Sequence, residues 1–281
     1  MQYDFSDKWK SWVPVIYHQI RNDFDVSRLN VKNVQEVYQK VNNIPRLPYL
    51  ELGYNKRVLV LMENGYGDDI WFYRYFLELK DKINFTAFIP DKIKPLYTEI
   101  NTITELPEDL SEYDYWMWSF DFLMLYPKVF RTNKYLSVES IQLPIRNKPK
   151  VGFALGNSNT IEQMKNRAID NKLISYFPEV EVYNFSDIDI PNCHNVFKEL
   201  KDFRDTAQYI EAMDYIICSD NCILHLAGAL GKKTMAIFSN GWEWNWDALP
   251  NSVLWYSSVD FVITNTSEKL EQLSQRIKEK L

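Results

Sequence analysis

The sequence predicts an α/β protein with two doubly wound parallel-sheet domains. Short apolar runs with the composition of buried strands recur along the chain, and polar or glycine-containing turns follow them. Segments whose apolar residues recur at helical spacing lie between these runs, so strands and helices alternate in both halves. A length of 281 residues with 46% hydrophobic residues is sufficient for one large domain or two small ones with real cores.

The first half of the chain is expected to contain an N-terminal extension and a first domain. Residues 1–55 are polar and aromatic, and we interpret them as an extension that packs on the first domain and carries a helix at 31–41. The first buried strand is expected at 57–62, and a glycine-punctuated turn follows it. The next segment, 70–80, is apolar almost all round, as a buried helix is. Further elements are expected at 85–89 (strand), 93–100 (helix interrupted near Pro95) and 113–118 (strand).

Residues 141–150 are the predicted linker between the two domains. Pro144 and Pro149 lie in this stretch, which has no apolar period. We therefore place the first domain at 56–145 and the second at 146–281. In the second domain we expect strands at 150–155 and 181–185, a helix at 203–213 with Asp205 or Thr206 as its N-cap, and an amphipathic helix at 267–281.

The stretch Asp214–Gly231 is the most informative part of the sequence. A buried strand at 215–218 leads into the polar turn Ser219-Asp-Asn221, whose residue types cap helix N-termini. A short helix follows, Gly231 ends it, and another buried strand is expected at 234–238. Because free N–H groups at a helix start can hold an anion, this turn predicts a phosphate site.

Net charge, cysteine spacing and the lengths of the apolar runs restrict the classes of function and the location that we expect for the protein. A formal net charge of −6 gives no support to a broad grip on nucleic acid. The spacing of Cys193, His194, Cys218 and Cys222 matches no standard zinc pattern, so we interpret the cysteines as structural. The N-terminus lacks the features of a signal peptide, and no apolar run is long enough to span a membrane. We therefore expect a soluble protein of the cytoplasm.

Four segments carry a resemblance to a known family. In order they are Asn64–Tyr75, Asp202–Ala207, Ser219–Gly231 and Trp242–Trp246 with Trp255-Tyr256. They resemble glycosyltransferase family 9, the family of the lipopolysaccharide heptosyltransferases, in the form found C-terminal to TPR repeats. The resemblance extends roughly from Arg57 to Ser258, and the third segment is the most specific. No TPR array is expected upstream, because 55 residues cannot hold three repeats, so we expect a stand-alone domain.

This resemblance implies a GT-B fold, with two facing Rossmann-like domains, and an inverting transfer of a hexosyl, pentosyl or heptosyl group from a nucleotide-sugar. It implies no catalytic metal and no cofactor besides the donor. Asp68 takes the position of the general base. The sequence departs from the family's segment at Asn221, where the family has Thr, and at Cys222, where it has Ala. The donor site is expected to include Asn157, Lys165, Arg167, Asp205, Thr206, Asp220, Asn221, Cys222 and His225, and the acceptor side Tyr66, Trp118 and Asp121.

Several of these residues also have plainer interpretations. Asp68 or Asp69 would also serve as a cap of the helix that follows, and we interpret Asp69 as structural. His225 lies on an apolar helix, where a histidine is more often a core residue, and the tryptophans at 242–246 suit a core as well as a sugar platform. Two other functions remain open: a phage-type DNA-base glycosyltransferase with modified DNA as acceptor, and a catalytically silent module that binds a sugar nucleotide or docks a partner. The expected acceptor is a saccharide or another hydroxyl compound, in a bacterial or phage-infected cell, and the oligomeric state is open.

Overall fold

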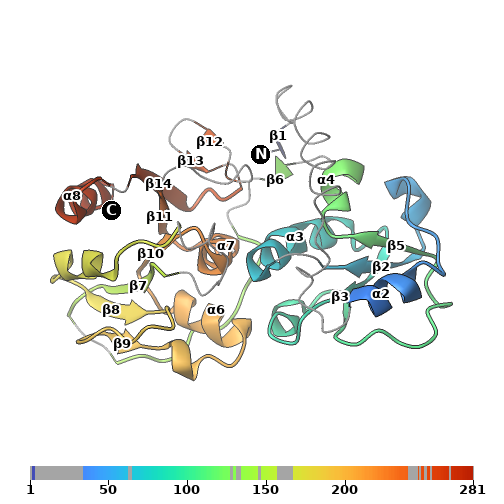
Figure 1. Cartoon of the computed structure of the whole chain (residues 1–281), viewed down its shortest axis with the longest axis horizontal. Coiled ribbons are helices and arrows are strands. Elements are labelled where there is room, and N and C mark those ends of the chain that lie inside the picture. Colours follow the sequence, from blue (N-terminus) through green and yellow to red (C-terminus); the bar gives the residue numbers. More distant parts are fainter. Residues whose placement is uncertain are drawn as a thin grey trace. The chain divides into compact units, whose positions relative to one another are not determined.

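The structure is a computed structural model in which the chain divides into two compact units, Met1–Phe130 and Arg131–Leu281. Figure 1 shows the elements of both units, and we treat each unit by itself. The structure describes residues 2–3, 34–62, 65–126, 129–130, 134–144, 147–156, 167–239, 246, 248–249, 252–253, 255–265 and 267–280.

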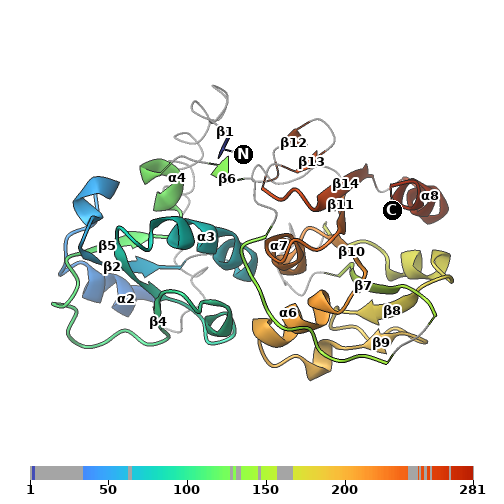
Figure 2. The same ribbon diagram turned by 180° about the vertical axis from the view of Figure 1, so that it is seen from behind.

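The first unit contains a parallel sheet of four strands in the order β4-β3-β2-β5. Figure 2 shows β4 at the edge of this sheet. The strands are β2 (Arg57–Leu61), β3 (Asn84–Phe88), β4 (Asn101–Ile103) and β5 (Tyr115–Trp118). The helices are α2 (Val34–Val41), α3 (Tyr66–Leu79) and α4 (Asp121–Leu125), and β1 (Gln2–Tyr3) pairs with β6 (Val129–Phe130) antiparallel.

Helix α3 is the centre of the first core, as its nearly continuous apolar surface predicts. Trp71, Phe72, Tyr75 and Phe76 on this helix are all 0% exposed. Phe76 and Tyr75 contact Phe122 of α4, with ring centroids 5.1 and 5.3 Å apart. This aromatic packing joins α3 to α4 in the core of the first unit.

The second unit contains a parallel sheet of six strands in the order β14-β11-β10-β7-β8-β9. Counted within this unit, the order is 3-2-1-4-5-6, that of dinucleotide-binding folds. The strands are β7 (Lys150–Ala154), β8 (Glu181–Asn184), β9 (His194–Asn195), β10 (Tyr215–Ser219), β11 (Thr234–Ser239) and β14 (Val259–Thr264). The helices are α6 (Phe203–Glu211), α7 (Cys222–Ala229) and α8 (Leu270–Lys278), and β12 (Ala248–Leu249) pairs with β13 (Ser252–Val253).

Two parallel sheets with intervening helices confirm the predicted fold class, while two local predictions are wrong. The expected helix at 93–100 is a single 3-10 turn, Lys94–Leu96, because the backbone leaves helical geometry at Tyr97 (φ −91°, ψ 76°) and the chain soon enters β4. Pro95 lies in the first turn, where its missing N–H has no helical partner to lose. The N-cap of α6 is Asp202, not Asp205 or Thr206. The Asp202 carboxylate accepts from the N–H groups of Arg204 and Asp205 at 2.8 and 3.0 Å.

The segment after the first unit lies along the second. Tyr135 N and Leu136 N donate to Ala229 O at the end of α7, at 2.9 and 3.0 Å. Ile141 N donates to Gln208 O of α6 at 3.4 Å. These bonds assign 134–144 to the second unit, so the division between the units precedes the proline-containing stretch 141–150.

Candidate active site

The second sheet has a topological switch point between β7 and β10. The chain continues from β7 to β8 on one side and from β10 to β11 on the other. The connections therefore diverge at the carboxyl ends of these two strands, the place where open α/β sheets bind ligands. Gly156, which follows β7, and the turn 219–221, which follows β10, meet there.

Asn221 joins the two strand ends with both atoms of its amide. Oδ1 accepts from Ile223 N at 2.9 Å and so caps α7, as the sequence predicts. Nδ2 donates to Ala154 O at 2.8 Å and to Gly156 O at 3.4 Å. A threonine hydroxyl has only one donor hydrogen and a shorter reach, so the asparagine adds a link across the switch point.

Asp220 is the middle residue of this turn, and it is only 7% exposed. Its Oδ1 accepts from the indole N–H of Trp246 at 2.9 Å, and its Oδ2 lies 3.3 Å from Arg167. Burial raises the pKa of this carboxyl, while Arg167 and the Trp246 bond act in the opposite direction. The carboxylate therefore connects residues from the segments that follow β7 and β11.

His225 lies in the second turn of α7 and is 4% exposed. Its Nδ1 is 2.9 Å from the hydroxyl of Tyr256, and its ring lies 4.5 Å from that of Trp246, centroid to centroid. The small residue Gly228 on the same helix allows Tyr256 to approach, since a Cβ there would lie 2.4 Å from Tyr256 Cγ. His225 is thus held in an aromatic cluster with Trp246 and Tyr256.

The remaining residues predicted for the donor site lie in α6, at the start of α7 or outside the described part of the chain. Thr206 is 5% exposed, and its hydroxyl donates to Asp202 O at 3.0 Å. The Asp205 carboxylate accepts from Lys201 N at 3.1 Å, so both side chains serve the first turn of α6. Cys222 begins α7, and burial raises its thiol pKa to about 11. Asn157, Lys165, Trp242 and Trp244 lie outside the described residues.

In the first unit, Asp68 occupies the first turn of α3, just beyond the carboxyl end of β2. Its side chain is half-buried, and Oδ2 accepts from Gly65 N at 3.3 Å. Asp68 therefore caps the helix, and a carboxylate in this place is also favoured by the helix dipole. Asp69 points inward and is 2% exposed, consistent with the structural role expected of it.

The residues predicted for the acceptor side have unequal access to solvent. Tyr66 is half-buried at the start of α3. Trp118 is 2% exposed and belongs to the core of the first unit. The Asp121 carboxylate accepts from Trp118 N at 2.9 Å and from Arg46 at 2.6 and 3.3 Å, an arrangement that fixes the end of β5.

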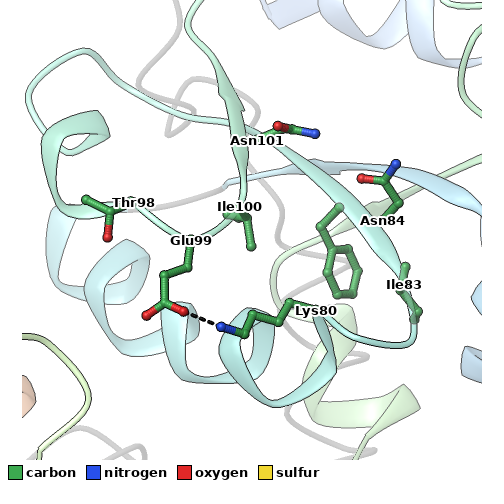
Figure 3. Close-up of a pocket in the computed structure, with 8 residues that line it drawn as sticks. Lys80, Ile83, Asn84, Thr98, Glu99, Ile100 and Asn101 are labelled. Carbon is green, nitrogen blue, oxygen red and sulfur yellow. Dashed lines mark hydrogen bonds and ion pairs between the residues drawn. The ribbon is translucent and has the colours of Figure 1, made fainter.

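A separate hollow of about 310 Å³ lies at the amino ends of β3 and β4. Figure 3 shows Lys80 and Glu99 in its wall, joined by an ion pair. It lies at the amino ends of the strands, whereas Asp68 lies just beyond the carboxyl end of β2, so the hollow does not belong to the predicted site. Within the described part of the chain, no group of three or more His, Cys, Asp or Glu side chains could hold a metal ion, and no helix is long and apolar enough to cross a membrane.

The sequence predicts no site contact for the side chain of Ser219 or Tyr256, although Ser219 belongs to the predicted turn at 219–221. Ser219 Oγ lies 3.2 Å from Leu155 O and adds a second link between β10 and the end of β7. Its position as the last residue of a buried strand was the available signal. Tyr256 lies almost thirty residues after α7, so only the folded structure shows that it contacts His225 and packs against Gly228.

Comparison with solved structures identifies the fold. The chain is similar to TibC from enterotoxigenic E. coli, a dodecameric iron-containing heptosyltransferase solved with ADP-D-β-D-heptose, at 13% identity and a TM-score of 0.51. That match covers 79% of this chain and 65% of TibC, so the chain spans less than two thirds of TibC. It is also similar to E. coli ADP-heptose LPS heptosyltransferase II, at 11% identity and a TM-score of 0.50, over 79% of this chain and 98% of that one.

A glycosyl transferase family 9 protein from Veillonella parvula matches at 12% identity and a TM-score of 0.48, over 82% of this chain and 90% of that one. No family model matches this sequence, and neither does any curated protein. The first two matches confirm the expected α/β fold of the GT-B kind.

Proposed function

We propose that this protein is a glycosyltransferase that moves a sugar from a nucleotide-sugar to an acceptor hydroxyl with inversion. The observation that carries the proposal is the switch point of the second sheet. There the start of α7, the Asn221 link and Arg167 form an anion-binding edge, on a fold similar to that of heptosyltransferases. Because the diphosphate of a nucleotide-sugar is an anion, this edge supports a nucleotide-sugar as the donor.

The donor diphosphate would bind at the start of α7. The positive end of the helix dipole favours an anion there, although two first-turn N–H groups, those of Ile223 and Leu224, are already bonded to Asn221. Arg167 lies at the same edge, because Ile169 N donates to Leu155 O at 2.9 Å and ties the segment to the end of β7. A guanidinium stabilises the charge that grows on the departing diphosphate, the task that a metal ion performs in other transferases.

The acceptor would be activated by Asp68. Its carboxylate accepts the proton of the acceptor hydroxyl while that oxygen forms a bond to the anomeric carbon. The bond from this carbon to the phosphate oxygen breaks at the same time, and its electron pair leaves with the nucleoside diphosphate. General-base help of this kind contributes about 10²–10⁴-fold to the rate. Attack from the side opposite the leaving group inverts the configuration.

A thermal-shift panel tests the donor site. Nucleoside diphosphates (ADP, GDP, UDP and CDP) and nucleotide-sugars are added to the full chain with and without EDTA. A ligand at a hundred times its Kd stabilises the native state by about 2.7 kcal/mol, which raises Tm by roughly 5–10 °C for a unit of this size. We expect a shift with one nucleotide family that EDTA does not abolish. No shift with any compound would refute the donor site, and a shift lost with EDTA would refute the metal-free version.

Asp68→Asn tests the base, because an asparagine oxygen still accepts from Gly65 N and preserves the cap. We expect the release of nucleoside diphosphate from the donor to fall by about 10²–10⁴-fold, with an unchanged nucleotide shift. The matched control is Asp81→Asn, an exposed residue beyond the other end of α3, which should keep full activity.

The same assays separate the other two functions. Nucleotide binding without any turnover in the parent protein would identify a silent binding module. Turnover that requires duplex DNA, with a salt-dependent gel shift, would identify a DNA-base glycosyltransferase.

A further inference from the structure

We propose that Asp220 is a positioning residue that holds the Arg167 guanidinium at the switch point, and that it does not itself contact the donor. This inference rests on the proposed donor site. It departs from the expectation, taken from the resemblance, that Asp220 binds the donor directly.

The contacts of the carboxylate support an indirect role. Its two oxygens face two different protein donors, Trp246 at 2.9 Å and Arg167 at 3.3 Å. The side chain is 9% exposed, which leaves little surface for a ligand. A second anion placed against it would be repelled strongly at this depth, where charges interact more strongly than in water. A donor diphosphate is therefore better matched to the cation beside Asp220 than to Asp220.

The Trp246 bond makes Asp220 a rigid anchor. Trp246 is 0% exposed and lies within ring contact of His225, Phe238 and Tyr256, at centroid distances of 4.5, 5.7 and 6.1 Å. One oxygen of Asp220 is thus fixed to the core. The other oxygen extends that rigidity to Arg167, whose side chain is 22% exposed and has several rotatable bonds.

The geometry also suits a cation with two anionic partners. A guanidinium presents five N–H donors in a planar fork, so it can contact a carboxylate and a phosphate together. Fixing the guanidinium in advance lowers the ordering cost that binding would otherwise carry. The predicted result is tighter binding of the diphosphate than a mobile arginine would achieve.

A double-mutant cycle on nucleotide affinity tests this role. The probe is the tightest binder among ADP, GDP, UDP and CDP, measured by calorimetry on the full chain. Asp220→Asn keeps an oxygen for the Trp246 N–H but removes the charge that holds Arg167. We expect it to raise Kd about tenfold in the parent protein and to have no further effect in an Arg167→Ala background, because the two residues act as one unit.

The matched control is Asp214→Asn. Asp214 precedes β10 at the opposite edge of the same sheet, and its carboxylate accepts from Lys150 N at 2.7 Å. This variant undergoes the same chemical change and should leave Kd unchanged whatever its Tm. A tenfold effect of Asp220→Asn in both backgrounds would show direct contact with the ligand and overturn the proposal.

Two further outcomes are distinct. If the parent protein binds none of the four diphosphates, the donor site itself fails, and the positioning role fails with it. If Asp220→Asn does not fold, Trp246→Phe replaces it, since phenylalanine keeps an aromatic ring in the cluster while it removes the N–H that anchors Asp220 together with part of the indole ring. That variant should raise Kd in the parent background and leave it unchanged when Arg167 is alanine, and equal effects in both would overturn the proposal.

Discussion

Substituting Gly228 by alanine should destabilise the second unit, although alanine is the better helix former. A Cβ on this residue would lie 2.4, 2.5 and 2.7 Å from Cγ, Cδ1 and Cδ2 of Tyr256. These atoms are at the base of the ring, so relief requires a shift of the Tyr256 backbone or of the whole helix. Tyr256 is 0% exposed and its hydroxyl is 2.9 Å from His225 Nδ1, so both ends of the side chain are held.

The magnitude follows from two opposing effects. Overpacking a rigid core costs about 3 kcal/mol at the upper end of its usual range. Alanine in place of glycine within a helix returns about 1 kcal/mol. The net loss of about 2 kcal/mol should lower Tm by roughly 4–8 °C for a unit of this length. Displacement of Tyr256 should also loosen His225 and Trp246, so nucleotide affinity should fall in parallel.

Urea unfolding of Gly228→Ala, followed by tryptophan fluorescence, measures this loss. The control is the same substitution in a Tyr256→Ala background, where the ring is gone and Gly228→Ala should stabilise by about 1 kcal/mol. A neutral or stabilising effect in the parent protein would refute the reasoning, because the close approach would then carry no energetic consequence.

Three other substitutions or reagents test separate parts of the structure. Asn221→Ala should lower the free energy of unfolding in urea by about 2 kcal/mol, since it removes a helix cap and the bond to Ala154 O, and a loss below about 0.5 kcal/mol would contradict the link. Asp121→Ala should lower the free energy of unfolding by about 2 kcal/mol by the same assay, because it removes the acceptor of the Trp118 N–H and the partner of Arg46. The loss stays moderate because Arg46 is 42% exposed and regains water, and an unchanged midpoint would mean that the pair contributes nothing. The Cys222 thiol has a pKa of about 11 against an ordinary value of 9, so at pH 8 it should react with a disulfide reagent about tenfold more slowly than a free cysteine, because its smaller thiolate fraction outweighs the higher nucleophilicity of that thiolate. Its contribution to stability should be complete below pH 9 and lost as the pH rises through 11. Reaction of native Cys222 at the rate of free cysteine would contradict the raised pKa.

The fold class and the cap at Asn221 were predictable because both depend on local pattern. Apolar runs of strand length and residue types that cap helices are visible in the sequence itself. The positive φ of 69° at Gly231 likewise agrees with the stop expected there. The choice among several acidic residues was not predictable: Asp202, rather than Asp205, caps α6 because its extended backbone aims the carboxylate at the first-turn N–H groups.

The tertiary parts of the site were beyond such patterns. Nothing local shows that the Asn221 amide reaches the end of β7, or that Trp246 bonds to Asp220, since each contact joins residues far apart in the chain. Strand β14 was missed for another reason. Its alternating run contains Asp260 and lies at the sheet edge, so it lacks the continuous apolar signal of the central strands.

The central position of β7 has a consequence for how the second unit forms. Its neighbour β10 pairs Cys218 with Ala154, so the middle of the sheet joins residues separated by more than sixty positions. During synthesis, β7 leaves the ribosome well before β10, its second partner in the sheet. One edge of β7 therefore stays unpaired until Ser219 has left the ribosome. Such non-local pairing slows folding and exposes strand edges meanwhile. The side chains of Ser219 and Asn221, which bond to the end of β7, fasten β10 to β7 at the carboxyl ends of the two strands.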